Sequence, residues 1–257
     1  MRSDFLRNDS YHSTEVVVCS KDKIFETVPE VLFRAGFEPK EYGLVLVKPN
    51  LCGLYHPENR LIEATLRFLF PHSRRIVVGE TNSMGHTPDV QFRRLGIDDM
   101  LKPFGDRVEA LNLMKDEILE LEVPSPHAVS RLPIPRLVRD CDLLVNIPRV
   151  GAHSRTLLTC ALKNLFGLLA EGNKYDVYHP LGVDKVIADL PKIVRCDLNI
   201  ADAGDKVVVG VDPLSVDIFA CRFVGLDPLK VEHLRLVSQD RDVRLEDAVK
   251  KLRIVSM

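Results

Sequence analysis

Six short apolar segments, separated by helical patterns, constrain the fold of this chain more than any other feature. They are runs rather than alternations, and turn-forming or polar residues close each one: 15–20 (EVVVCS), 43–50 (GLVLVKPN), 74–80 (RRIVVGE), 142–148 (DLLVNIP), 197–203 (DLNIADA) and 206–212 (KVVVGVD). Runs without polar alternation are typical of strands covered on both faces, as in parallel sheets. Because strands and helices take turns along the chain, we expect βαβ crossovers.

The segments between these strands complete the predicted fold. Helical patterns cover residues 23–35, 58–70, 156–169, 183–193 and 213–224, and one or two helices with a short final strand are expected over 229–257. Residues 106–136 instead show short alternating stretches with prolines. We therefore predict an α/β fold with an open, mostly parallel sheet, helices on both faces, and a small irregular or antiparallel excursion around 106–136. At 257 residues and 46% hydrophobic content, the chain is predicted to form a single α/β domain over 1–257.

Charge and composition narrow the classes of partner. The 35 Lys and Arg nearly balance the 37 Asp and Glu, so no net field favours nucleic acid or an anionic membrane. The N-terminal segment MRSDFLRNDSYHST lacks the apolar centre of a signal peptide, and no apolar run approaches the roughly 18 residues of a membrane span. We expect a cytoplasmic protein. An open sheet edge near the termini leaves a homodimer as an alternative to a monomer.

The six cysteines are scattered singly, without a CxxC pair. This spacing argues against a structural zinc site and against an intrinsic iron–sulfur cluster. We expect reduced cysteines that pack as small apolar side chains. Cys52, which follows a charged loop, is the one candidate for a reactive thiol.

Polar side chains follow two of the predicted strands at the point where each strand ends. Lys48 and Asn50 flank one proline, and Asn146 and Arg149 flank another. In open α/β sheets, ligands bind beyond the carboxyl ends of the strands. Two strand ends that each carry an amide and a cationic side chain would form a positively charged rim at this edge of the sheet. The sequence thus predicts a site for a small anion that carries phosphate or carboxylate.

The helix predicted over 156–169 carries one lysine among apolar residues. Projection at 100° per residue places Thr156, Thr159, Cys160, Lys163 and Gly167 on one stripe, with Asn164 at its edge. Lys163 either extends to the surface or points into a polar pocket as a point charge for an anion. A serine cap at Ser154, near the predicted helix start, would also favour an anion.

Carboxylates and histidines near the strand exits are candidates for proton transfer. Glu80 and Asp202 each end a strand. Their carboxylates could bind a divalent cation or accept a proton. Asp217 lies one turn beyond Asp212, which is a sensible helix cap. The histidine candidates are His153 in the cationic loop and His179 in the run YDVYHP. No P-loop, GxGxxG, HExxH or GxSxG motif is present.

Several of these segments together resemble a known family. The matching pieces, in order, are VLVKPNL (45–51), VVGETNS (77–83), DLLVNIPRVGAHSRTLLTCALKNLFGLL (142–169), DLNIADA (197–203) and VDPLSVDIFACRFVGLDP (211–228). They resemble the domain of unknown function 362 (DUF362) family, and ALKNLFG is the most specific of them. The resemblance implies an α/β fold with a shared set of polar positions. Members are often joined to ferredoxin-like iron–sulfur modules, which implies a link to redox metabolism. This chain lacks that cysteine-rich segment, so a separate ferredoxin-like protein is the implied partner.

Three functional hypotheses follow. The first is an enzyme that acts on a small anionic metabolite at the C-terminal edge of the sheet. Its predicted ligand-binding residues are Lys48, Asn50, Asn146, Arg149, Lys163, Asn164 and His179. Its predicted proton-transfer residues are His153 and Glu80. The second is a non-catalytic anion-binding or scaffold module for an iron–sulfur partner. The third is a divalent-metal-dependent enzyme with Glu80, Asp202 and Asp217 as ligands.

Overall fold

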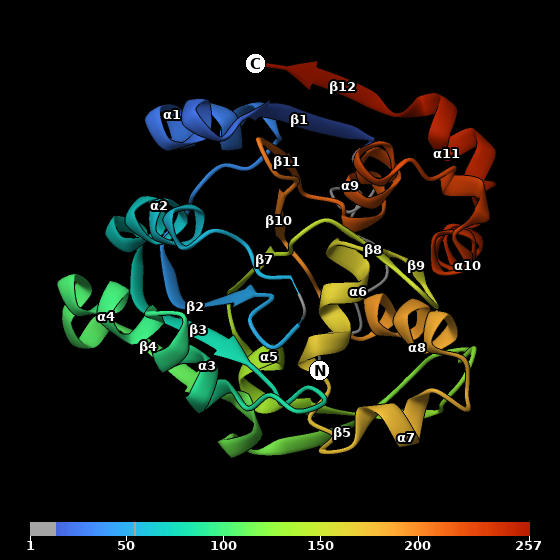
Figure 1. Ribbon diagram of the computed structural model, residues 1–257, viewed down its shortest axis with the longest axis horizontal. Helices are drawn as coiled ribbons and strands as arrows, with labels where there is room; N and C mark the ends of the chain where they lie inside the picture. The colour runs from blue at the N-terminus through green and yellow to red at the C-terminus, as the bar shows by residue number, and fades with distance from the viewer. Residues whose placement is uncertain (1–13, 54) are drawn as a thin grey trace.

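A mixed sheet forms the centre of the computed structural model, which describes residues 14–53 and 55–257. Among these residues, eight strands pair in the order β12-β1-β11-β10-β7-β2-β3-β4 (Figure 1). Their bounds are β1 Glu15–Ser20, β2 Tyr42–Pro49, β3 Ser73–Glu80, β4 Val108–Asn112, β7 Leu143–Ile147, β10 Leu198–Asp202, β11 Lys206–Gly210 and β12 Arg253–Ser256. All six predicted apolar segments are strands of this sheet. Most of the N-terminal segment examined for a signal peptide, residues 1–13, lies outside the described residues.

The strand directions confirm the predicted mostly parallel sheet. β10, β7, β2, β3 and β4 are mutually parallel, and β12 is parallel to β1. Only β11, of the described strands in this sheet, runs antiparallel to both neighbours. The carboxyl ends of β2, β3, β7 and β10 therefore meet at one edge, and this edge carries the predicted polar exits.

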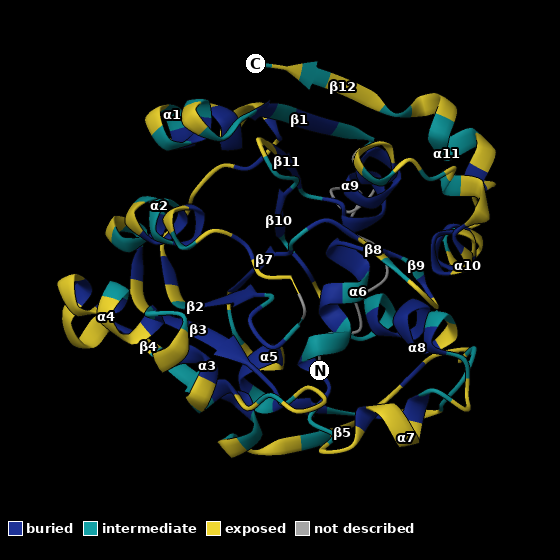
Figure 2. Cartoon of the chain, viewed as in Figure 1, coloured by how far each residue is buried: buried dark blue, intermediate teal, exposed yellow. Residues whose placement is uncertain are grey.

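Helices cover both faces of the sheet, as predicted. Figure 1 shows the blue and green helices on one side and the yellow to red helices on the other. One face carries α1 (Lys21–Arg34), α2 (Asn59–Leu69), α3 (Pro88–Arg94) and α4 (Ile97–Leu101). The other carries α5 (Arg136–Asp140), α6 (Ala161–Leu165), α7 (Lys174–Tyr178), α8 (Val183–Asp189), α9 (Pro213–Ala220), α10 (Glu232–Asp240) and α11 (Leu245–Lys251). Buried strands and inward helix faces make up the core (Figure 2).

The excursion around 106–136 is confirmed in its second half. β5 (Ile118–Glu122) and β6 (Arg131–Pro135) form an antiparallel pair outside the main sheet. Its first half differs, because β4 pairs in parallel with β3 as an edge strand of the main sheet.

The prediction of one helix over 156–169 is wrong for the residues that precede Ala161. β8 (Gly151–His153) and β9 (Leu157–Thr159) form an antiparallel hairpin, and Leu157 adopts a left-handed φ of 60°. α6 begins at Ala161, and the buried Asp217 carboxylate accepts hydrogen bonds from the N–H groups of Ala161 and Leu162 at 2.6 and 3.0 Å. Ser154 is therefore in the hairpin turn and caps no helix. Thr156 and Thr159 do not share a helical stripe with Lys163.

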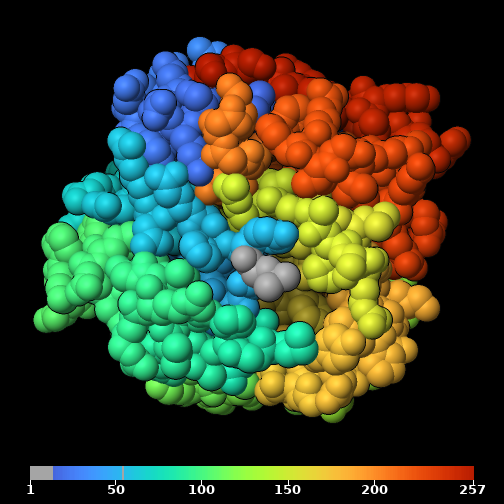
Figure 3. All heavy atoms as spheres, viewed as in Figure 1, coloured from blue at the N-terminus to red at the C-terminus, as the bar shows by residue number. Residues whose placement is uncertain are grey.

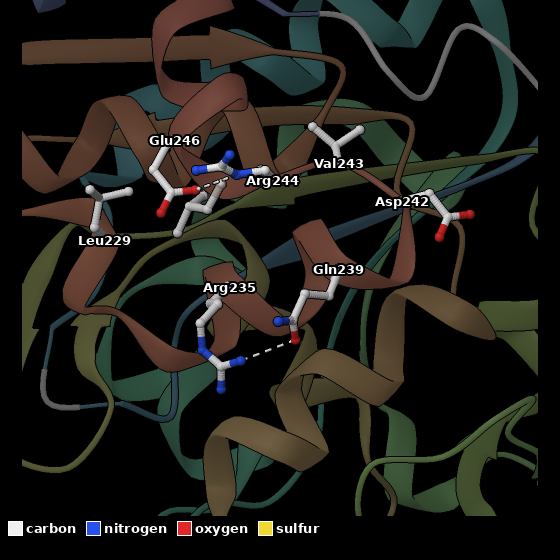
Figure 4. Close-up of a pocket in the computed structure, with 8 residues that line it drawn as sticks. Leu229, Arg235, Gln239, Asp242, Val243, Arg244 and Glu246 are labelled. Atoms are coloured by element: carbon white, nitrogen blue, oxygen red, sulfur yellow. Dashed lines mark hydrogen bonds and ion pairs between the residues drawn. The ribbon is translucent and has the colours of Figure 1, made fainter.

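A depression of about 420 Å³ lies at α10 and α11, where Arg235 donates to Gln239 and Arg244 pairs with Glu246 (Figure 4). It is lined by the C-terminal helices and not by the strand exits.

In the described part of the chain, no helix is both long and apolar enough to cross a bilayer.

Candidate functional site

A row of polar side chains crosses three neighbouring strands in the middle of the sheet. Lys48 pairs in register with Asn146, and Asn146 pairs with Asn199 on β10. All three are 0% exposed. Because side chains alternate along a strand, Lys48 and Asn146 lie on the same face as Leu46 and Leu144, which pack with α6. Polar groups at this depth need hydrogen-bond partners.

The asparagine of α6 supplies several of those partners. Asn164 Nδ2 donates to Asn146 Oδ1 at 2.7 Å and to the Lys48 carbonyl at 3.1 Å. Asn146 Nδ2 in turn donates to the Ala161 carbonyl at 3.0 Å and to Asn199 Oδ1 at 2.9 Å. This network joins α6 to the strand exits. The predicted residues Asn146 and Asn164 are thus neighbours. The side-chain amides of both are hydrogen-bonded to other groups of the protein.

Lys48 and Glu80 form a buried ion pair at the end of this row. Lys48 Nζ lies 2.9 Å from Glu80 Oε2, and it also donates to Asn164 Oδ1 at 3.0 Å and to the Pro49 carbonyl at 3.1 Å. The Glu80 carboxylate accepts from the backbone N–H groups of Leu51 and Thr81 at 3.1 and 3.0 Å. Both charges are therefore fully bonded within the described residues. Both oxygens of Glu80 are thus engaged within the protein, by Lys48 and by two backbone N–H groups.

The pair stands at the point where the strand order reverses. From β2 the chain passes outward to β3 and β4, and it later returns to place β7 and β10 on the opposite side of β2. Ligands of open α/β sheets bind at such switch points. Figure 3 shows a small recess between the segment after β3 in teal, the region of the β8–β9 hairpin and α6 in yellow, and the α7 segment in gold.

Lys174 is a site residue that the sequence analysis missed. It begins α7, is 9% exposed, and donates to the Thr81 hydroxyl, which itself donates to the Gly167 carbonyl. Burial lowers the pKa of Lys174 to about 7. Glu80 opposes this shift, and Lys48 and Lys163 add to it. The only sequence signal was its closeness to His179, since a lysine in the polar run EGNKYD otherwise indicates a solvated turn.

Lys163 points to the same region without a partner of its own. Its side chain makes no hydrogen bond or ion pair with any residue in 14–53 or 55–257, whereas its backbone carbonyl accepts from the Phe166 N–H. Burial lowers the pKa of Lys163, Asp184 raises it in part, and Lys48 lowers it further. Lys163 is partly exposed, so its position lies between the surface and the pocket interpretations of the sequence.

Burial lowers the pKa of both candidate histidines. His153 Nδ1 accepts from the backbone N–H groups of Arg155 and Thr156 at 3.3 and 3.2 Å. Because Nδ1 accepts these bonds, the neutral ring carries its proton on Nε2. Burial, with Lys163 and His179 adding, lowers the pKa of His153 to about 4. His179 stacks on Tyr175 at 3.9 Å, and its Nδ1 is buried without a hydrogen-bond partner among the described residues. Burial, with Arg155 adding, lowers the pKa of His179 as well.

Two predicted ligand-binding residues are engaged elsewhere. Asn50 Nδ2 donates to the Tyr55 carbonyl at 2.8 Å and so orders its own loop. Arg149 pairs with Asp202, whose carboxylate also lies 3.0 Å from Lys21 Nζ and accepts from the Glu58 N–H at 2.9 Å. The expected rim of two matching cations is therefore not formed. Lys48 faces α6, whereas Arg149 neutralises the end of β10.

The three carboxylates predicted as metal ligands are not brought together. Glu80 pairs with Lys48, Asp202 pairs with Arg149 and Lys21, and Asp217 caps α6. Over residues 14–53 and 55–257, no group of three His, Cys, Asp or Glu side chains is arranged to hold a metal ion. The geometric expectation behind that hypothesis is wrong.

Cys52 lies beside the site but is not a thiolate. Its side chain is buried, and burial with the nearby Glu80 charge raises the pKa of Cys52 to about 12. The thiol stays protonated at neutral pH, so the expectation of a reactive cysteine is not supported. All six cysteines lie in the described part of the chain and are free.

Gly167 permits the close packing over the ion pair. A Cβ at this position would lie 2.7 Å from Lys48 Nζ and 3.1 Å from Glu80 Oε1. Lys48 has three bonds to lose by moving, so we expect Gly167→Ala to lower the free energy of unfolding by about 1–3 kcal/mol in urea denaturation. Gly172→Ala is the matched control, because a Cβ there meets nothing within 4 Å. Equal effects of the two substitutions would contradict this packing.

This chain is similar in sequence or in fold to several known proteins. A thylakoid-associated protein of Synechocystis sp. is 27% identical over 122 residues, which are 41% of this chain and 38% of that protein. The lactate racemase apoprotein of Thermoanaerobacterium thermosaccharolyticum aligns with a TM-score of 0.50 and 14% identity, over 84% of this chain and 58% of that one. A crystal structure from Thermotoga maritima aligns with a TM-score of 0.47 and 14% identity, over 79% and 58%. This chain spans less than two thirds of each of these proteins, and the likeness to the racemase apoprotein concerns the fold alone.

The family comparison covers the site itself. The model described as "Domain of unknown function (DUF362)" matches residues 45–206. That range begins within β2 and ends at the start of β11, so it holds Lys48, Glu80, Asn146, Lys163 and Lys174. The match extends over well more than half of the chain and contains the polar row, the ion pair and α6. This chain therefore belongs to the DUF362 family.

Proposed function

We propose that this protein is an enzyme that binds a small metabolite anion, carrying carboxylate or phosphate, beside α6 at the C-terminal edge of its sheet. The observation that carries the proposal is a group of three lysines whose charges act on one another and of which, among the described residues, only Lys48 has a carboxylate within hydrogen-bond distance. Lys48, Lys163 and Lys174 influence one another electrostatically, and Glu80 is already paired with Lys48. The site is thus short of negative charge.

An anion would supply the missing charge. Lys163 has no bonding partner among the described residues, and Lys174 has only a hydroxyl. Charge-assisted hydrogen bonds to a carboxylate or phosphate are the strong kind, and they gain further where water is scarce. Asp184 offsets part of the charge of Lys163 but leaves the pKa of that lysine lowered.

Lys174 and His179 fit the proton transfer better than the residues first predicted for it. His153 has its Nδ1 bonded to backbone N–H groups, and Glu80 is saturated by Lys48, Leu51 and Thr81. A general base works best when its pKa lies near the working pH, and the pKa of Lys174 is about 7. Coupling to a separate ferredoxin-like protein stays a prediction.

Replacing Lys163 tests the anion site. We expect Lys163→Met to weaken binding of inorganic phosphate and of pyruvate about tenfold, or about 1.4 kcal/mol, because the unpartnered ammonium is lost. Thermal shift titrations at constant ionic strength measure this. The control is Lys102→Met, since that side chain is 75% exposed and pairs only with the surface residue Asp99. If both variants respond to the anions as the parent does, the site is not at Lys163.

Turnover separates an enzyme from a binding protein. Metabolites that raise the melting temperature would be incubated with the protein, and mass spectrometry would compare the mixtures before and after incubation. New products that disappear in Lys174→Arg support an enzyme. Stabilising ligands that are all recovered unchanged would favour the non-catalytic binding module.

A further inference from the structure

The amine of Lys174 is shielded from water, yet it is bonded to a neutral group alone. Its residue is 9% exposed, and the Thr81 hydroxyl is the one hydrogen-bond partner of Nζ among the described residues. A buried ammonium without a carboxylate is costly, whereas a buried neutral amine is much less so. Lys48 is the opposite case, because its ammonium has Glu80 at 2.9 Å. The two lysines therefore have different chemistry within one site.

Hydrogen-bond directions around Thr81 leave the lone pair of a neutral Lys174 free. The Thr81 hydroxyl donates its proton to the Gly167 carbonyl, so its oxygen only accepts from Lys174. Lys174 thus donates an N–H to this bond and keeps its lone pair for another group. A neutral amine with a free lone pair is a nucleophile toward carbonyl carbon.

The surrounding charges keep this amine available at neutral pH. Burial lowers the pKa of Lys174 from 10.5 to about 7, with Glu80 opposing and with Lys48 and Lys163 contributing. An ordinary exposed lysine with a pKa near 10.4 is almost entirely charged at pH 7, so the neutral fraction of Lys174 is larger by roughly a thousandfold.

We propose that Lys174 forms an imine with the carbonyl carbon of a 2-oxo acid whose carboxylate is bound by Lys163. This assignment rests on the proposed anion site and names its substrate class. The amine lone pair forms the new C–N bond as the C=O bond breaks. The carbonyl oxygen leaves as water with the two hydrogens lost from nitrogen, so neither oxidant nor reductant is needed. A carboxylate next to the carbonyl suits a site in which the charge of Lys163 acts on Lys174.

Reductive trapping tests the imine directly. The protein would be incubated with pyruvate and sodium cyanoborohydride at pH 7, and peptide mapping by mass spectrometry would locate the reduced adduct. We expect labelling of Lys174 to exceed that of the exposed Lys102 by about tenfold or more, given their different neutral fractions. Lactate, which carries the carboxylate but no carbonyl, is expected to give no adduct and to compete with pyruvate. Lys174→Arg lacks the nucleophilic amine and is expected to remove the adduct.

The outcomes separate this inference from the anion site. If pyruvate raises the melting temperature but its adduct is spread evenly over exposed lysines, the imine is overturned and the anion site stands. If propanal labels Lys174 while pyruvate and phosphate neither stabilise nor compete, the anion site fails and the 2-oxo acid class fails with it. Because the mapping is done on the unaltered chain, the result does not depend on the folding of any variant.

Discussion

Glu80→Gln is expected to lower the free energy of unfolding by about 3–5 kcal/mol, because it leaves the Lys48 ammonium buried without its counter-charge. Lys48 is 0% exposed and Glu80 is 2% exposed, so water cannot solvate the remaining charge without opening the sheet edge. Glutamine keeps one oxygen, which can accept from the N–H of Leu51 or of Thr81 but not from both, because these two groups bond Oε2 and Oε1 of Glu80. Urea denaturation at pH 7 measures the effect.

Two further variants identify the cause. Lys48→Met combined with Glu80→Gln removes both charges and is expected to be much closer to the parent in stability than Glu80→Gln alone. Glu63→Gln disrupts the exposed Glu63–Arg67 pair of α2 and is expected to cost less than about 0.5 kcal/mol. A double variant as unstable as the single one would show that the loss comes from packing rather than from the unpaired ammonium.

Lys174→Met is expected to stabilise the protein by about 2 kcal/mol at pH 7, although it removes a residue of the proposed site. The lowering of the Lys174 pKa from 10.5 to about 7 corresponds to roughly 4–5 kcal/mol of penalty on the charged form. Loss of the hydrogen bond to Thr81 offsets part of the stability gained by removing that penalty. Sites arranged for function often carry such a cost in stability.

The pH dependence of this difference has a definite sign. The folded pKa of Lys174 lies below its unfolded value, so between about pH 7 and 10.5 the unfolded chain binds more protons and stability rises with pH. Lys174→Met lacks this contribution, so its advantage over the parent is expected to shrink as the pH is raised from 7 to 9.5. Lys102→Met is expected to show no such trend. An advantage that stays constant would mean that Lys174 is charged in the folded protein over this whole range.

The sequence was most informative where local pattern and sheet geometry agree. Lys48 and Asn146 end apolar runs, and parallel strands bring such ends to one edge, so their proximity was predictable. Asn199 was missed, although it interrupts an apolar run as Asn146 does. The hairpin before α6 was also missed, because a short apolar run such as TLLT fits a helix or a strand, and the left-handed φ of Leu157 is not marked by a glycine.

Lys174 was beyond prediction for a different reason. Its neighbours in the sequence are polar, and its burial comes from contact with Thr81, 93 positions away along the chain. The pairing of Arg149 with Asp202 was likewise set by the order of the strands, since Arg149 and Asp202 meet through a bridge between the segment after β7 and the end of β10. Such contacts decide which polar residues face a ligand and which are consumed in holding the fold.

The row formed by Lys48, Asn146 and Asn199 also bears on how the sheet assembles. Val- and Leu-rich parallel strands carry little information about register, because one apolar residue replaces another at small cost. A slip of one position would turn a strand's side chains to the opposite face and present Lys48 or an asparagine to the apolar layer under α1 and α2. Each misaligned pairing would bury an amide or a charge without its partner, while the native one bonds them all. The polar row therefore selects one alignment of β2, β7 and β10 as the chain folds, before any ligand is present.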